Sequence, residues 1–115
     1  MSGETRPWGF FTVLGRGEGW WVKMISVRPG HRLSLQSHEK RWETWTVVEG
    51  EGEAQIEGNT LRLRHGQVLR VDPRERHRLS NPFARRLVVM EVATGICEEG
   101  DVTRYEDDYG REVKR

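Results

Sequence analysis

Three side chains that can bind a metal ion lie within eight positions of one short segment, LSLQSHEKRWETW at 33–45. Gln36, His38 and Glu43 supply an amide oxygen, an imidazole and a carboxylate, and His77 in the later segment RERHRLSN supplies a second imidazole. On a strand, Gln36 and His38 are two positions apart and leave from the same face. A mixed nitrogen and oxygen donor set of this kind suits a divalent ion such as Zn, Mn, Co, Ni or Fe(II). The other interpretation is a polar, solvated strand surface.

The segments around these residues have the pattern of short strands. Apolar runs separated by Gly or Pro occupy about nine segments, and none shows helical periodicity over a useful length. The expected strands are 10–14, 20–27, 32–38, 43–50, 53–58, 60–66, 68–73, 77–82 and 85–95. A polar tail over 101–115 follows, which could form a strand, a short helix or a frayed end. This spacing predicts an all-β sandwich, jelly roll or small barrel. In such a scaffold, strands distant in sequence can bring ligands together at one end.

Composition limits the classes of function. The chain has 115 residues, which predicts a single domain over 1–115 with a core over about 6–105. Its 19 basic and 18 acidic residues are interspersed and leave a net charge of +1, so no nucleic acid or membrane partner is expected. Cys97 is the only cysteine, and the first residues contain no apolar leader segment. We therefore expect a cytoplasmic protein.

The spacing of the candidate ligands matches a known pattern. Five residues separate Gly30 from Gln36, four separate His38 from Glu43, and six separate Glu43 from Gly50. This resembles the first motif of the cupin superfamily, with Gln at its first histidine position. The second cupin motif is matched at Gly66, His77 and Asn81, whereas Asp72 and Arg74 replace its usual Pro and Gly. The resemblance implies a single-domain cupin, that is, a double-stranded β-helix or jelly-roll barrel.

Longer segments resemble one branch of the cupins. RPWGFFTVL, LSLQSH, RWETWTVVEG, HRLSNP and DVTRYEDDYGR occur in the same order as in the C-terminal domain of type II mannose-6-phosphate isomerases, from about Arg6 to Arg111. That domain usually follows a mannose-1-phosphate guanylyltransferase domain, and here we expect a free-standing form. The resemblance implies interconversion of mannose 6-phosphate and fructose 6-phosphate. A divalent metal would stabilise the enediol or enediolate intermediate, and a base would move the proton.

The resemblance and the strand parity together assign roles to five more residues. Lys23 shares a face with inward residues of its strand, so we expect it to contact substrate or assist catalysis. Arg41 and Arg111 match the RxExW and DxYGR segments and are candidates for substrate or phosphate binding. Glu91 is the candidate proton carrier, or else an acid paired with an arginine. Trp45 either lines the pocket floor or packs in the core.

Two departures from the family keep other functions open. Lys40 and Thr44 stand where this branch usually has histidines. The chain is therefore also compatible with a non-catalytic metal- or sugar-binding module, or with a cupin that acts on another small metabolite. A homodimer is expected because cupins often pair and because Trp20 and Trp21, being adjacent on a strand, must point to opposite faces.

Overall fold

The computed structural model describes residues 2–113, and this part of the chain contains strands and no helix. The all-β prediction is confirmed. The twelve strands are β1 Ser2–Arg6, β2 Gly9–Gly17, β3 Trp20–Val27, β4 His31–Arg32, β5 Leu35–Ser37, β6 Arg41–Glu49, β7 Gly52–Ile56, β8 Asn59–Leu63, β9 Val68–Val71, β10 His77–Asn81, β11 Leu87–Gly95 and β12 Thr103–Glu106. No helix capable of crossing a membrane occurs among residues 2–113.

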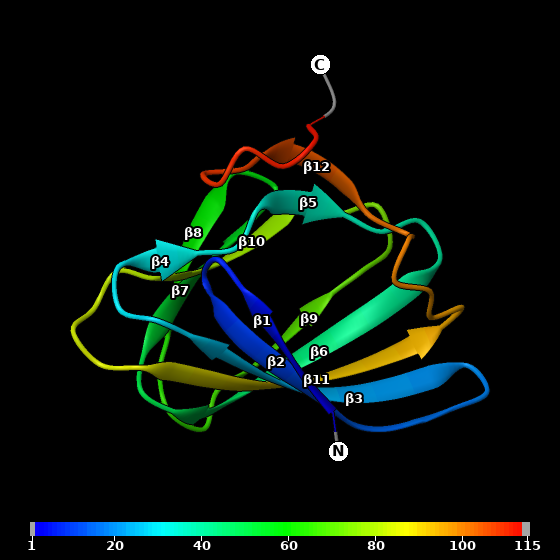
Figure 1. Cartoon of the computed structure of the whole chain (residues 1–115), viewed down its shortest axis with the longest axis horizontal. Coiled ribbons are helices and arrows are strands. Elements are labelled where there is room, and N and C mark those ends of the chain that lie inside the picture. The colour runs from blue at the N-terminus through cyan, green and yellow to red at the C-terminus, as the bar shows by residue number, and fades with distance from the viewer. Residues whose placement is uncertain (1, 114–115) are drawn as a thin grey trace.

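The strands form two antiparallel sheets that face each other, as Figure 1 shows. One sheet has the order β1-β2-β3-β11-β6-β9 and the other the order β12-β5-β10-β7-β8, with β4 also paired to β10. The first sheet is built around β11, which pairs with both β3 and β6. Strands from the start, middle and end of the sequence are therefore neighbours in one sheet.

The inward face of the first sheet changes from apolar to charged along its strands. Val47 and Trp45 of β6 are buried, and two positions further toward the strand start Glu43 is also buried. On β3 the inward row likewise runs from Val27 to Lys23. The alternation of side chains along a strand produces these rows. The apolar ends form the core, and the charged ends gather at one opening between the sheets.

A tight turn at Gly50 and the buried side chain of Asn81 hold this arrangement. Gly50 directly follows β6 with a φ of +78°, and an added Cβ would lie 2.3 Å from the carbonyl oxygen of Arg86. Asn81 is fully buried, and its side-chain amide donates to the carbonyls of Val27 and Arg85 at 2.9 and 2.8 Å. These contacts join the end of β10 to β3 and to the segment before β11.

The sequence prediction of about nine strands took β4 and β5 as one strand, omitted β1 and left the segment of β12 undecided. Strands β1 and β12 are short and polar, so neither shows the apolar alternation that marks a strand. Arg78 holds β12 in place, because its Nε donates to the carbonyl of Leu33 and its Nη1 pairs with Glu106 at 3.1 Å. The β12 part of the polar tail thus forms one edge of the second sheet. The last two residues of the predicted tail lie outside the described residues.

Candidate functional site

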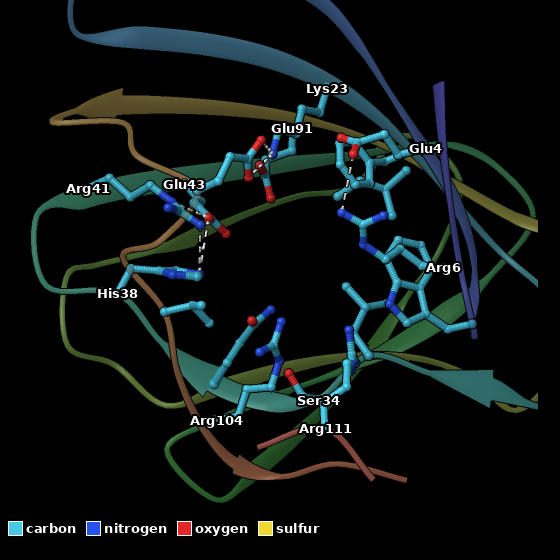
Figure 2. Close-up of a pocket in the computed structure, with 17 residues that line it drawn as sticks. Glu4, Arg6, Lys23, Ser34, His38, Arg41, Glu43, Glu91, Arg104 and Arg111 are labelled. Carbon is cyan, nitrogen blue, oxygen red and sulfur yellow. Dashed lines mark hydrogen bonds and ion pairs between the residues drawn. The ribbon is translucent and has the colours of Figure 1, made fainter. Parts of the chain in front are cut away.

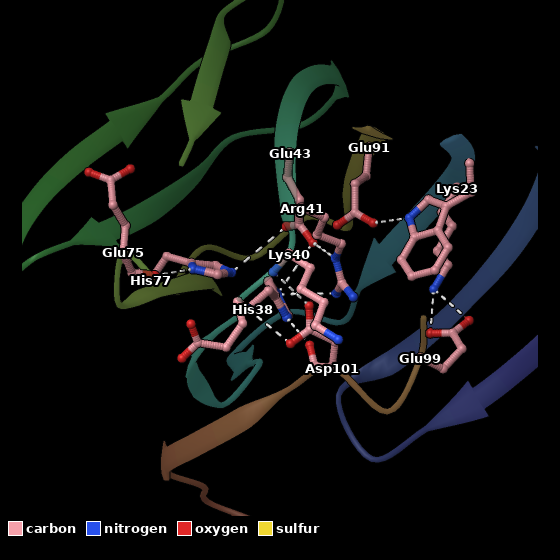
Figure 3. Close-up of polar contacts among 12 residues, drawn as sticks. Lys23, His38, Lys40, Arg41, Glu43, Glu75, His77, Glu91, Glu99 and Asp101 are labelled. Carbon is pink, nitrogen blue, oxygen red and sulfur yellow. Dashed lines mark hydrogen bonds and ion pairs between the residues drawn. The ribbon is translucent and has the colours of Figure 1, made fainter. Parts of the chain in front are cut away.

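Three of the four predicted metal ligands converge between the sheets (Figure 3), and we call them the metal cluster: His38, Glu43 and His77. One ligand atom from each lies within 4.8 Å of the others. His38 Nε2 is 3.3 Å from one Glu43 oxygen, and His77 Nε2 is 3.8 Å from the other. His38 follows β5, Glu43 lies on β6 and His77 begins β10. All three side chains are buried.

Backbone carbonyls orient both imidazoles. His38 Nδ1 lies 2.7 Å from the carbonyl of Asp101, and His77 Nδ1 lies 2.9 Å from the carbonyl of Glu75. A carbonyl oxygen only accepts, so each Nδ1 carries the proton and each Nε2 keeps its lone pair. Burial lowers the pKa of His77, and burial followed by the charge of Arg41 lowers the pKa of His38 to about 3. Both rings are therefore neutral, the form that binds metals.

One unpaired nitrogen in the metal cluster favours a bound metal ion. Nε2 of His77 is buried and has no hydrogen-bond partner among residues 2–113. Leaving a buried polar atom unpaired is costly, and a cation in front of it would use its lone pair. The tautomers, the carboxylate and this orphaned atom together fit a divalent ion. A carbonyl behind each histidine is also the usual second-sphere support of a metal ligand.

Gln36, the fourth predicted ligand, lies beside the metal cluster. In the pairing of β5 with β10, Gln36 is directly opposite His77. Directly opposite residues of an antiparallel pair project to the same face. Gln36 also lines the same cavity as His38 and Glu43. Gln36 thus belongs to the wall of the cavity on which two of the cluster ligands lie.

Arg41 uses the same acceptor atoms that a metal would use. Its Nε donates to Glu43 at 2.9 Å, its Nη2 donates to His38 Nε2 at 3.2 Å, and its Nη1 donates to the carbonyl of Glu98. The guanidinium is buried and stacks on the Trp21 ring at 4.6 Å. Arg41 was predicted to contact substrate and does line the cavity, yet its donors are engaged by protein atoms. A metal bound to His38 would displace its contact with Nε2.

A cavity of about 280 Å³ opens beside the metal cluster (Figure 2). This size lies at the small end of ligand pockets and suits a small metabolite. Apolar side chains line part of its wall, namely Trp8, Phe11, Ile25, Leu33 and Val102. The polar lining consists of Glu4, Arg6, Lys23, Ser34, Gln36, His38, Arg41, Glu43, Glu91, Glu99, Arg104 and Arg111. The cavity therefore combines an apolar surface with many charges.

Glu91, the predicted proton carrier, lies on the cavity wall in β11. Its register partners are Lys23 on β3 and Trp45 on β6, which places it between the two strands that carry the other charges. Trp21 Nε1 donates to one of its oxygens at 2.9 Å. Burial, followed by the nearby charge of Glu43, raises the pKa of Glu91 to about 7. A carboxyl group with such a pKa can both accept and release a proton at neutral pH.

Lys23 reaches the cavity, as the strand parity predicted, and it is buried. Its Nζ lies 2.8 Å from both carboxylate oxygens of Glu99 and packs over the rings of Trp21 and Phe11 at 3.9 and 4.6 Å. Glu99 belongs to the loop between β11 and β12, and about half of its side chain is exposed. The loop carboxylate therefore covers the lysine from the solvent side.

The remaining two predicted residues have different surroundings. Trp45 is buried in the core cluster, and its ring meets the His77 ring edge-on at a centroid distance of 5.7 Å. It is not among the side chains lining the cavity, so it supports His77 from behind. Arg111 does line the cavity, and its Nε and Nη2 both bind the carboxylate of Asp107 at 3.0 and 2.8 Å.

Sequence reasoning did not single out several site residues. Asp101 accepts from the backbone amides of Glu39 and Lys40, and its own carbonyl holds His38. Arg104 faces the cavity from β12. Both residues belong to the polar tail, where no periodic pattern indicated a strand or a buried face. The pairing of β12 with β5 helps to place this tail at the site.

Comparison with known proteins gives the family. Residues 2–107 match the family described as mannose-6-phosphate isomerase C-terminal. The mannose-1-phosphate guanylyltransferase ManC of Salmonella typhimurium is 40% identical over 107 residues, which cover 92% of this chain and 22% of that protein. The chain thus spans less than a quarter of the length of this relative.

Solved structures show the fold. The cupin domain of Cnp3 from Schizosaccharomyces pombe superposes with a TM-score of 0.72 at 13% identity, covering 75% of this chain and 64% of that one. A protein from Klebsiella pneumoniae described as having a double-stranded β-helix domain has a TM-score of 0.72 at 20% identity, covering 81% and 80%. The cupin prediction is confirmed, and the chain belongs to the mannose-6-phosphate isomerase C-terminal family.

Proposed function

We propose that the protein is a metal-dependent aldose–ketose isomerase for a sugar phosphate, of the mannose 6-phosphate/fructose 6-phosphate type. The observation that carries the proposal is a pair of neutral histidines and a carboxylate beside a cavity that also contains Glu91, whose pKa is raised to about 7. Isomerisation needs a cation that stabilises negative charge on the substrate oxygens and a side chain that moves a proton between two carbons. The metal ligands and Glu91 would supply these two parts. Membership of the family supports the same reaction.

One divalent ion would be held by the metal cluster, with the Gln36 amide as a further ligand. The donor set of two imidazoles, one carboxylate and one amide is compatible with Zn, Mn, Co, Ni or Fe(II). When bound, such an ion supplies a Lewis acid that stabilises negative charge on the substrate oxygens. The protein contributes the neutral tautomers, through the carbonyls of Asp101 and Glu75, and the buried carboxylate of Glu43.

Glu91 is the proposed proton carrier. It would take the proton from C2 of the aldose and return it to C1, while the hydroxyl proton of O2 passes to O1, and the reverse reaction would run the same transfers backward. Trp21 holds one carboxylate oxygen, which leaves the other for the substrate. Lys23, the register partner of Glu91, takes no part in the proton transfer. Its positive charge would stabilise negative charge that develops on the substrate oxygens during the reaction. Its contact with Glu99 would open as substrate enters.

A non-catalytic metal- or sugar-binding module is the second candidate function. Two observations favour it: Lys23 and Arg41 are already paired with Glu99 and Glu43. Lys40 and Thr44 also replace two histidines of the family pattern. A protein with these features would bind metal and sugar phosphate without turnover.

The experiment is a turnover assay on the full chain. The protein is treated with EDTA, reloaded with each divalent ion in turn, and supplied with mannose 6-phosphate and related aldose phosphates. Glu91→Gln should abolish turnover while metal binding, measured by elemental analysis, persists, and His77→Ala should lose both. Binding of sugar phosphates without turnover under every metal would reject the isomerase and support the binding module.

Two further expectations remain predictions. A cytoplasmic location is proposed from the lone Cys97, which suits a reducing compartment. A homodimer is proposed because Trp20, Trp42 and Val92 are exposed on the first sheet, where Thr94 pairs with both tryptophans. Sedimentation of the wild type beside a Trp42→Lys variant tests the dimer, since the variant should sediment as a monomer.

A further inference from the structure

The cavity has a second charged region, separate from the metal cluster, formed by three arginines from three segments. Arg6 ends β1, Arg104 lies on β12, and Arg111 follows β12 near the end of the described chain. All three line the cavity that His38 also lines. In Figure 2, Arg104 and Arg111 lie at the edge opposite Glu91, and Arg6 lies on the side opposite His38.

Arg104 has too few partners for a half-buried cation. Its Nε is buried and makes no hydrogen bond within residues 2–113. Burial is the main cause that lowers the pKa of Arg104. The positive charges of Arg111 and Arg6 lower this pKa further, and the negative charge of Asp107 raises it. A buried cation without an anion is unfavourable, and binding an anion removes that cost.

The acids nearby do not neutralise the group of arginines. Nε and Nη2 of Arg111 both donate to the carboxylate of Asp107, and Arg6 Nη2 lies 3.6 Å from the half-exposed carboxylate of Glu4. Three positive charges and these two negative ones leave one positive charge uncompensated. The Arg6–Glu4 pair is exposed and contributes little, so Arg6 can turn to a stronger anion at small cost.

Strand register places this region one substrate length from the metal cluster. Arg104 is directly opposite Gln36 on one side of β5, and His77 is opposite Gln36 on the other. Because neighbouring strands lie about 4.8 Å apart, the backbones of Arg104 and His77 are about 10 Å apart. A sugar chain with its carbonyl end at the metal cluster and a phosphate on its last carbon bridges such a distance.

We propose that Arg104, together with Arg6 and Arg111, forms the subsite for the phosphate group of the substrate. The inference rests on the proposed function for the identity of the substrate, but the subsite itself requires only a phosphate. An arginine fork matches two phosphate oxygens at once, and several arginines balance the two charges of a phosphate monoester. The apolar wall that includes Phe11 and Ile25 lies along the same cavity and suits the C–H faces of the sugar.

The first test measures binding of inorganic phosphate to the EDTA-treated full chain by calorimetry, so that neither metal nor turnover is needed. Arg104→Gln should weaken binding about 10- to 100-fold, because it removes a hydrogen bond between two charged groups. Arg6→Gln should weaken it less. Arg70→Gln is the matched control, because Arg70 is exposed and pairs with Asp72 outside the cavity. Equal phosphate binding by the wild type and Arg104→Gln would overturn the proposal.

A second measurement separates this inference from the proposed function. Where the metal-loaded protein isomerises mannose 6-phosphate, Arg104→Gln should raise KM with little change in kcat, and an unchanged KM would overturn the subsite while the isomerase stands. Where there is no turnover, loss of phosphate binding in Arg104→Gln supports the subsite without the isomerase. Circular dichroism checks folding, and if Arg104→Gln does not fold, Arg6→Gln decides in the same two assays.

Discussion

Replacing Glu91 by Gln tests the electrostatics of the cavity without relying on catalysis. Gln has the same shape and keeps an oxygen that can accept from Trp21 Nε1, but it cannot ionise. Burial and the charge of Glu43 raise the pKa of Glu91 from 4.5 to about 7 in the folded protein. The folded state therefore binds more protons than the unfolded state between these values, and the wild type loses stability from this group as pH rises through them.

The size of the effect follows from the same two pKa values. Between pH 5 and pH 8, ionisation of Glu91 should cost the wild type about 2–3 kcal/mol of unfolding free energy. Glu91→Gln should escape that loss, so its stability relative to the wild type should improve by the same amount. The lowered pKa values of His38 and His77 act in the opposite direction, but they are present in both proteins and largely cancel in the difference.

The assay is urea unfolding in EDTA at several pH values from 5 to 8, with two-state fits and a common m-value. EDTA is needed because a bound cation would neutralise Glu43 and lower the pKa of Glu91. Glu18→Gln removes one exposed negative charge outside the cavity and should follow the wild-type pH dependence. If the free energies of Glu91→Gln and wild type run parallel from pH 5 to pH 8, the raised pKa is refuted.

Three other substitutions give definite expectations. Asn81→Ala leaves the carbonyls joined by Asn81 without a donor and should lower the unfolding free energy by about 3 kcal/mol, measured by urea unfolding; no loss would contradict the bridging role. Gly50→Ala should cost about 2 kcal/mol more than Gly30→Ala, because both have a φ of +78° but only Gly50 has a backbone oxygen 2.3 Å from the new Cβ; equal losses would show that φ alone matters. Arg41→Gln should bind Zn²⁺ about tenfold more tightly in a chelator competition, because it removes a cation that competes for His38 and Glu43; weaker binding would show that Arg41 positions the ligands.

Much of the fold and of the metal cluster could be predicted from the sequence, because the relevant signals are local. Alternation along 43–50 put Glu43 and Val47 on one face, and both are buried. The same parity predicted that Lys23 points inward, which the structure bears out. The short edge strands β1 and β12 could not be found in this way, because their side chains are polar and their pairing partners are distant in sequence.

The sequence by itself determined which ligand types occur and which strand face carries them, since spacing and alternation are properties of neighbouring residues. Only the tertiary structure decided the protonation and pairing of those groups. The tautomer of His38 depends on a carbonyl at Asp101, 63 positions away, and Arg104 reaches the cavity because β12 pairs with β5. The pKa of Glu91 likewise depends on how deeply the sheets bury it. Burial and long-range contacts set these properties, and neither can be read from neighbouring residues.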